Sequence, residues 1–237
     1  MASVSENYRC LRDRMEEALH RAGRSLTEVT WVAVTKNVSP EVIRQAWDCG
    51  LRHFGENRVQ EVQRKWLDPS GRRFLEDVTL HMLGHLQTNK SKPAARLFDS
   101  LQSLDGLPLA QMLSRECVAR EKTLDCLIEV KVSEEPTKTG VSPEALGLLM
   151  AEVLAHPALR VRGFMTLAPY SDDPEKSRPY FRKLRELAEI HRGSFSGERP
   201  VLSMGMSHDF EVALEEGATM VRIGTALFGD RPAIHKG

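Results

Sequence analysis

The sequence predicts an α/β fold, a single-domain (β/α)8 TIM barrel spanning residues 1–237. Eight short apolar runs rich in β-branched residues alternate strictly with segments of helical periodicity, which favours a parallel sheet with helical crossovers. The length of 237 residues also suits a barrel of eight such units, which typically needs about 250 residues. An open doubly wound sheet is the alternative, and the lack of GxGxxG after the first strand counts against it.

The predicted elements follow one another along the chain with no linker between them. Apolar residues spaced by three and four predict an amphipathic first helix over residues 5–22. We expect strands near residues 30–36, 53–57, 80–86, 98–104, 124–132, 160–167, 201–206 and 220–225. We expect the other helices near residues 40–51, 57–67, 89–96, 107–121, 143–155, 174–191 and 208–216, and a loop over residues 193–200.

Proline marks three of the expected helix starts. A proline at the first helical position has its φ angle already set and lacks only an N–H that the helix would leave unpaired. A preceding serine or aspartate can cap the helix, and a following glutamate suits the positive end of its dipole. The three segments are 39–41 (Ser-Pro-Glu), 142–144 (Ser-Pro-Glu) and 173–175 (Asp-Pro-Glu), and each predicts a helix that begins at the proline.

Composition and charge exclude several classes of protein. The 33 Lys and Arg balance 33 Asp and Glu, which argues against a general nucleic-acid binder. The four cysteines form no CxxC pair, as expected for reduced thiols in the cytoplasm. The N-terminus lacks the apolar core of a signal peptide, and no apolar run approaches the about 20 residues of a membrane span. We therefore expect a soluble cytoplasmic protein without membrane partners, and a monomer because no long apolar helix face is left over.

Polar residues and glycines gather where the expected strands end. In such barrels the functional sites form at the carboxyl ends of the strands, so these positions are the first candidates. The stretches concerned are 35–36, 55–57, 84–90, 165–169, 203–207 and 222–225. Their clustering predicts one site at the mouth of the barrel.

Two of these strand exits, SMGMSHDF and RIGTALFG, have the composition of a phosphate site. Barrels commonly bind phosphate with the loops after strands seven and eight, where backbone N–H groups face the anion. Gly224 permits a close approach of the backbone, and the hydroxyl groups of Ser207 and Thr225 are donors. Turn glycine and helix capping explain the same residues, so the pattern alone leaves both interpretations open.

Lys36 ends the apolar run WVAVTK, directly before a turn. A lysine there is most often a solvated surface charge. At the mouth of a barrel, partial desolvation would lower its pKa and free the amine to form a Schiff base. Together with a phosphate site and Arg222, such a lysine suits pyridoxal 5′-phosphate (PLP). An arginine facing the pyridine nitrogen would keep that nitrogen unprotonated and make PLP a poor electron sink.

Other candidate residues carry weaker signals. His81 and His85 lie on a strand and its exit, where a spacing of four does not place two rings around one metal ion, so we expect no metal site. Lys138 follows the fifth strand and could reach an anion, including a second PLP, although a surface lysine is the default interpretation. Cys126, within TLDCLIEV, is expected in the core.

Four segments, several of them long, carry a resemblance to a known family. They are VAVTKNVSPEVIRQAWDCGLRHFGENRVQE, HMLGHLQTNK, GFMTLAP and LSMGMSHDFEVALEEGATMVRIGTALFG. In this order they resemble the pyridoxal phosphate homeostasis proteins, the PLP-binding YggS/PROSC family. The resemblance implies a fold-type III PLP-binding barrel, similar to the N-terminal domain of alanine racemase but without the second, β-rich domain of those enzymes.

The resemblance also implies roles for individual residues. Lys36 corresponds to the lysine that binds PLP, and Arg222 to the arginine near the pyridine nitrogen. Ser203, Gly224 and Thr225 correspond to phosphate-binding positions. The full set of implied cofactor-binding residues is Lys36, Asn57, Ser203, Met206, Ser207, Arg222, Gly224 and Thr225.

The function that the resemblance implies is non-catalytic. The protein would hold PLP as a Schiff base on Lys36 and act in intracellular PLP homeostasis, by buffering PLP or delivering it to PLP-dependent apoenzymes. The first alternative is a minimal PLP-dependent amino-acid racemase, which the missing second domain and the arginine both disfavour. The second alternative is a barrel that binds a different phosphate ester.

Overall fold

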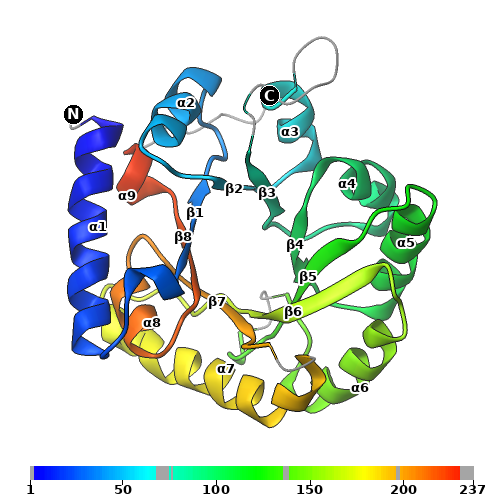
Figure 1. The fold of residues 1–237 in the computed structure, drawn as a ribbon. Coiled ribbons are helices and arrows are strands. Elements are labelled where there is room, and N and C mark those ends of the chain that lie inside the picture. Colours follow the sequence, from blue (N-terminus) through cyan, green and yellow to red (C-terminus); the bar gives the residue numbers. More distant parts are fainter. Residues whose placement is uncertain (1–2, 68–74, 76, 136–138, 196–197, 230–237) are drawn as a thin grey trace.

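A closed ring of eight parallel strands forms the centre of the molecule, with helices around it (Figure 1). This computed structural model describes residues 3–67, 75, 77–135, 139–195 and 198–229. Each strand pairs with the next along the chain, and the ring closes where the first strand pairs with the eighth, Val32 opposite Arg222. The predicted (β/α)8 barrel is therefore confirmed.

The elements alternate as the sequence pattern predicts. The strands are β1 (Thr30–Val34), β2 (His53–Glu56), β3 (Thr79–Met82), β4 (Ser100–Leu104), β5 (Leu124–Glu129), β6 (Leu159–Met165), β7 (Val201–Met206) and β8 (Met220–Ile223). The α-helices are α1 (Val4–Arg21), α2 (Pro40–Asp48), α3 (Val59–Lys65), α4 (Ser91–Leu97), α5 (Leu107–Val118), α6 (Pro143–Leu154), α7 (Arg178–Ile190), α8 (Phe210–Glu215) and α9 (Thr225–Phe228). Short 3₁₀ helices are η1 (Leu26–Glu28), η2 (Thr88–Lys90), η3 (Pro174–Ser177) and η4 (Arg192–Phe195).

Several predicted boundaries differ from the structure at the ends of strands and loops. The first strand ends at Val34 rather than residue 36, because the amide of Val38 donates to the carbonyl of Thr35 at 3.0 Å and closes a turn. The fourth strand begins at Ser100 rather than residue 98, because the amide of Phe98 still bonds to the preceding helix. The loop expected over 193–200 begins within η4. The turn after β1 and the helix end before β4 therefore set these limits, and the residue pattern does not show them.

Two of the three proline-marked helix starts are confirmed. Helix α2 begins at Pro40 and helix α6 at Pro143. The third segment behaves differently, because Pro174 opens the short 3₁₀ helix η3 and α7 begins only at Arg178, followed by a second proline. A proline within the first turn of a helix costs no hydrogen bond, so the second proline selects the new start.

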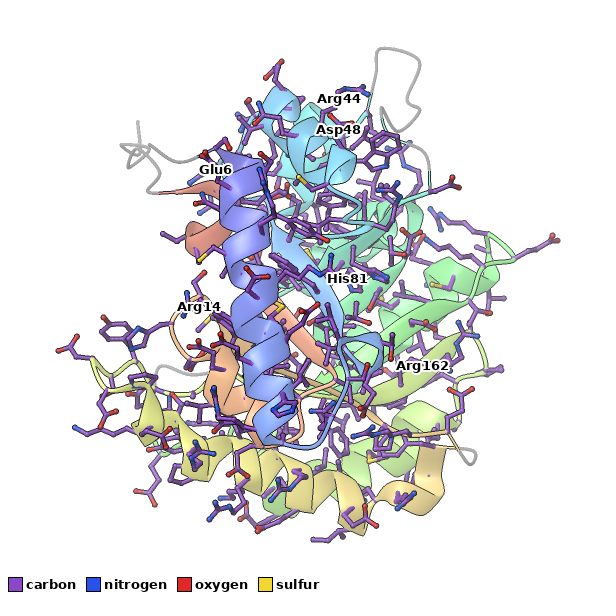
Figure 2. All side chains as sticks on the ribbon, turned by 60° about the vertical axis from the view of Figure 1, so that its left-hand side comes forward. Glu6, Arg14, Arg44, Asp48, His81 and Arg162 are labelled. Carbon is purple, nitrogen blue, oxygen red and sulfur yellow. The ribbon has the colours of Figure 1, made fainter. Side chains whose placement is uncertain are left out.

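The first helix, α1, packs along the outside of the barrel against α8 and α9 (Figure 1). The ring of Tyr8 stacks on that of Trp31, on β1, with centroids 5.2 Å apart. Arg14 forms two hydrogen bonds of 3.0 Å with Glu211 of α8. Figure 2 brings α1 to the front, with Glu6 near its start and Arg14 near its middle. The helix thus covers the part of the wall where the ring closes.

Two apolar clusters hold the barrel together. The larger fills the space between the strands and the surrounding helices. The smaller lies inside the ring and is formed by Val32, Leu127, Met165 and Met220. The inner cluster is small because polar side chains of β2, β3, β4, β7 and β8 share the interior with it.

Gly163, on β6, offers a test of how closely the wall is packed. Its φ of +153° is rare for residues with a side chain, and a Cβ atom there would overlap the backbone of Val201 on β7. We expect Gly163→Ala to lower the free energy of unfolding by about 2 kcal/mol, measured by urea denaturation. The matched change Gly193→Ala, where a Cβ atom meets nothing within 4 Å, should stay within about 0.5 kcal/mol of the wild type. Equal stability of the two variants would contradict the close approach.

Candidate functional site

The residues predicted to form the site lie on four strands that are consecutive around the ring, β7, β8, β1 and β2. Met206 pairs with Arg222, Val32 with Arg222, and Val34 with Gly55, so the carboxyl ends of these strands are neighbours. The eight predicted residues follow or end these strands at one rim of the barrel, apart from Ser203 and Arg222, which lie deeper in the ladder.

Lys36 lies in the turn directly after β1. Its side chain is exposed, whereas Thr35 before it and Val38 after it are buried. Asn37 takes a left-handed conformation with φ of 59°, which asparagine tolerates better than most residues. The alternation of β1 places Val32 in the inner cluster and Ala33 in the outer one, and the strand ends at Val34, two residues before Lys36.

A buried charged network holds this turn from below. Lys65 of α3 donates to the carbonyl of Thr35 at 2.7 Å and contacts Glu56 at 2.8 Å. Its ammonium group also bonds to Glu61 at 2.9 Å, and Glu61 accepts the amide of Asn37 at 3.0 Å. The residues on both sides of Lys36 are therefore tied to one ammonium group, which fixes where the exposed lysine projects.

Glu56 is the most buried acid of this network. Its Oε1 accepts from the hydroxyl of Thr35 at 2.7 Å and from the indole of Trp66 at 3.0 Å. Burial raises the pKa of Glu56, and the nearby ammonium of Lys65 opposes that shift. Burial also acts to raise the pKa of Glu61, but the amide of Asn37 and Lys65 together leave it lowered. One lysine thus compensates two carboxyl groups.

Asn57 lies half-buried at the exit of β2 and lines a cavity of about 700 Å³ beside the barrel mouth. The other lining residues include Asn37, Arg58, Glu61, Arg64, Met82, His85 and Lys90. Gly84 lies so close that a Cβ atom there would overlap the carbonyl of Asn57. We call this space the rim cavity. Three basic side chains on its wall, those of Arg58, Arg64 and Lys90, favour an anionic ligand.

Arg222 is buried in the barrel, with its guanidinium held by two fixed partners. It donates to the hydroxyl of Ser203 at 2.6 Å and to the carbonyl of Thr166 at 2.8 Å. Burial lowers the pKa of Arg222 to about 10, which still leaves the group charged at neutral pH. Burial also raises the pKa of Glu129, a buried acid at the end of β5.

The loops after β7 and β8 meet at Ser207. Its Oγ accepts from the amides of Gly224 and Ala226, both at 3.2 Å. Two backbone donors at the start of α9 therefore point at one oxygen atom. Asp209 fixes the same loop, because it accepts from the amide of Met206 at 2.7 Å and from the hydroxyl of Ser177 at 3.0 Å.

Not all predicted residues fall into one cluster. Ser207 and Gly224 share hydrogen bonds at the rim, whereas Ser203 is fully buried beside Arg222 and donates to Gln102 at 2.7 Å. Met206 is exposed, as is Thr225. Lys138 lies outside the described residues. Within the described part of the chain, no group of three His, Cys, Asp or Glu side chains could hold a metal ion.

The sequence patterns missed several residues that the fold places beside this site or behind it in the barrel. Lys65 looked like an ordinary charge in the last turn of a helix, and Gln102 like a polar residue within a strand. The sequence spacing relates His81 only to His85. In the structure it bonds to His53 and Gln102, while His85 lies 3.1 Å from Asp105. The sequence does offer one signal for His81: a histidine among buried apolar residues of a strand needs hydrogen-bond partners inside the protein.

Comparison with known sequences places this barrel in a class. The family model described as "Alanine racemase, N-terminal domain" matches residues 3–232. A protein of Aquifex aeolicus named "Pyridoxal phosphate homeostasis protein" is 46% identical over 221 residues, 92% of this chain and 94% of the relative. The protein of the same name from Escherichia coli is 37% identical and covers 98% of both chains. The chain belongs to the family of pyridoxal phosphate homeostasis proteins.

Solved structures agree with this placement. PipY of Synechococcus elongatus, determined with PLP bound, is 32% identical, with a TM-score of 0.82 over 96% of this chain and all of that one. Its structure without PLP gives a TM-score of 0.84 at 33% identity, with the same coverage. An alanine racemase of Clostridium difficile matches 97% of this chain and 61% of its own at 12% identity, with a TM-score of 0.73. The last comparison shows the shared barrel fold alone.

Proposed function

We propose that the chain, acting as one barrel domain, binds PLP covalently through Lys36 and takes part in PLP homeostasis without catalysing a reaction of its own. One observation carries the proposal: four adjacent strands bring an amine and two converging backbone donors to one rim of the barrel, with a buried guanidinium below them. The name of the family and the PLP-bound structure of PipY support the choice of ligand.

The donor set of the two loops fits the phosphate group of PLP. The amides of Gly224 and Ala226 already converge on one oxygen, that of Ser207, and a phosphate oxygen can take its place. The hydroxyl groups of Ser207 and Thr225 can then donate to the phosphate. These residues would bind the anion without any lysine, which leaves the Lys36 amine for the aldehyde.

The covalent bond would form by simple condensation. The amine of Lys36 attacks the aldehyde carbon of PLP, a C=N bond forms, and one water molecule leaves. Arg222 would lie near the pyridine nitrogen, where its positive charge keeps that nitrogen unprotonated and weakens PLP as an electron sink. Such a site stores the aldehyde reversibly and suits buffering or delivery to PLP-dependent apoenzymes better than catalysis.

The phosphate assignment predicts a loss of affinity for Thr225→Val. Removing one hydrogen bond to a charged phosphate should raise the dissociation constant for PLP by about tenfold, measured by absorbance titration. Binding of pyridoxal, which lacks the phosphate, should stay unchanged. The exposed control Thr88→Val, at the other side of the rim, should bind PLP as the wild type does. An equal loss for pyridoxal would place Thr225 away from the phosphate.

The minimal racemase remains testable by an isotope experiment. We expect L-alanine, incubated with the PLP-loaded protein in deuterated water, to keep its Cα proton. Exchange that is rapid and absent from Lys36→Ala would favour the enzyme.

The expected monomer and cytoplasmic location are part of the same proposal. Within the described residues, the structure contains no helix with the length and apolar character needed to cross a bilayer. A molar mass of one chain by light scattering is the expected result for the monomer.

A further inference from the structure

A continuous chain of hydrogen bonds crosses the inside of the barrel and ends on Arg222. The hydroxyl of Ser203 accepts from Arg222 at 2.6 Å and donates to Oε1 of Gln102 at 2.7 Å. Nε2 of Gln102 lies 3.0 Å from Nδ1 of His81, and Nε2 of His81 lies 3.0 Å from Nδ1 of His53. The chain joins β8, β7, β4, β3 and β2, and its Ser203–Gln102 link crosses the barrel between β7 and β4, which do not pair.

The chemistry of its members gives this chain one direction. Arginine can only donate, so Ser203 must accept from it, and its own proton is given to Gln102. Nε2 of Gln102 also lies 3.1 Å from the sulfur of Met220, which can only accept, and this fixes the orientation of the amide a second time. Nδ1 of His81 must then be an acceptor, so its proton is on Nε2 and points to His53.

The far end of the chain opens into a second cavity. This lower cavity has a volume of about 370 Å³ and lies at the amino ends of the strands. His53 is half-buried on its wall, and His81 lies behind it with 3% of its surface exposed. Figure 2 labels His81 and Arg162, two residues that line this cavity. The lower cavity thus gives solvent a route to the chain from the side opposite the rim.

The charges around His53 come from three further strands and balance each other. They are Asp99, before β4, Asp125 of β5, and Arg160 and Arg162 of β6. Arg160 pairs with Asp125 at 2.5 Å, Arg162 pairs with Glu198 at 2.5 Å, and Asp99 accepts the amide of Leu80 at 2.8 Å. Because each of these charged side chains already has a partner, we expect the charge of the lower cavity to change mainly through protonation of His53.

We propose that Gln102, His81 and His53 are positioning residues for Arg222: their one-way hydrogen bonds hold the Ser203 hydroxyl, and through it they keep the guanidinium oriented for PLP. The proposal deepens the proposed function, on which its PLP arm rests. Because the amide of Gln102 is fixed at one end by Ser203 and Met220, the imidazoles behind it have only one compatible arrangement. Ser203 is then committed to Arg222 and Gln102 rather than to the phosphate.

Protonation of His53 is incompatible with this arrangement. An imidazolium carries protons on both nitrogens, so Nδ1–H of His53 would face Nε2–H of His81. To avoid these two facing N–H groups, His81 would have to take its other tautomer and the amide of Gln102 would have to reverse. The reversed amide would turn the Gln102 oxygen toward the sulfur of Met220. Burial lowers the pKa of His53. Burial and the neighbouring His53 lower the pKa of His81 to about 3. As the pH falls, His53 is therefore the first of the two histidines to be protonated.

The first test needs no PLP. In the ligand-free protein labelled with ¹⁵N, two-bond ¹H–¹⁵N correlation at about pH 7.5 should show His81 and His53 as neutral Nε2–H tautomers. A proton on Nδ1 of His81 would overturn the one-way chain. Since the measurement uses the free protein, it stands even if PLP binds elsewhere or not at all.

The second test uses the loaded site. His53→Asn keeps an acceptor near Nδ1 but cannot titrate. We expect PLP affinity of the wild type to fall about two- to fivefold more than that of His53→Asn between about pH 7.5 and about pH 5.5, because neutral His53 is required and burial lowers the pKa at which it takes up a proton. His156→Asn, a change at another half-buried histidine, should follow the wild type. Equal pH profiles for the wild type and His53→Asn would overturn the proposal.

Discussion

Lys36→Ala is expected to abolish the visible absorbance band of protein-bound PLP while leaving the protein folded. The Lys36 side chain is exposed, in a turn whose backbone is held by Lys65. Truncating Lys36 therefore removes the amine without opening the core. The aldehyde of PLP then has no partner for condensation, although the phosphate loops and Arg222 remain. PLP should wash out during gel filtration, and absorbance before and after this step measures the loss.

The control for this result is Lys90→Ala. Lys90 lines the rim cavity at the same end of the barrel, so its removal lowers the positive charge of the region by the same amount. We expect the control to retain its PLP through gel filtration. If both variants lose PLP equally, general electrostatic attraction rather than a covalent bond retains the ligand.

Lys65→Met should have the largest effect on stability. The change leaves Glu56, a fully buried carboxyl group, and Glu61 without their shared cation, and it removes a donor from the carbonyl of Thr35. Removing one partner of a buried ion pair typically costs about 3–5 kcal/mol, and we expect a loss of this size in urea denaturation. The exposed control Lys92→Met should change the free energy of unfolding by less than about 0.5 kcal/mol.

A second change and the pH dependence identify the cause of that loss. Adding Glu56→Gln to Lys65→Met should recover part of the lost stability, because the uncompensated buried charge is gone. Burial raises the pKa of Glu56 and Lys65 opposes that rise, so without Lys65 the folded protein takes up a proton at Glu56 at a higher pH than the wild type does. The deficit of Lys65→Met should therefore shrink as the pH falls from about 8 to about 5. A deficit that is independent of pH would point to lost packing instead.

The sequence predicted the rim of the barrel better than its interior. Lys36, Asn57 and Gly224 could be assigned to one face because all strands of a parallel barrel end on the same side, whatever their register. The convergence of Gly224 and Ala226 on Ser207 required the short helix α9, which four residues could not reveal by periodicity.

The interior depends on register and on contacts across the ring. His53 pairs with Thr79 in the ladder, and this offset brings His81 within reach of His53. Gln102 and Ser203 meet although β4 and β7 are not neighbours. Lys65 meets Glu56 only because α3 folds back over the outer side of β2. No local pattern contains these distances, so the positions looked like surface charges or isolated polar residues.

The identity of the residue that carries PLP is the central claim, and borohydride reduction tests it most directly. The protein is loaded with PLP, reduced, denatured, weighed intact by mass spectrometry and then digested for peptide mapping. The account predicts one reduced pyridoxyl phosphate group per chain, located on Lys36. An unmodified Lys36 with the group on another lysine, or no added mass at all, would contradict it.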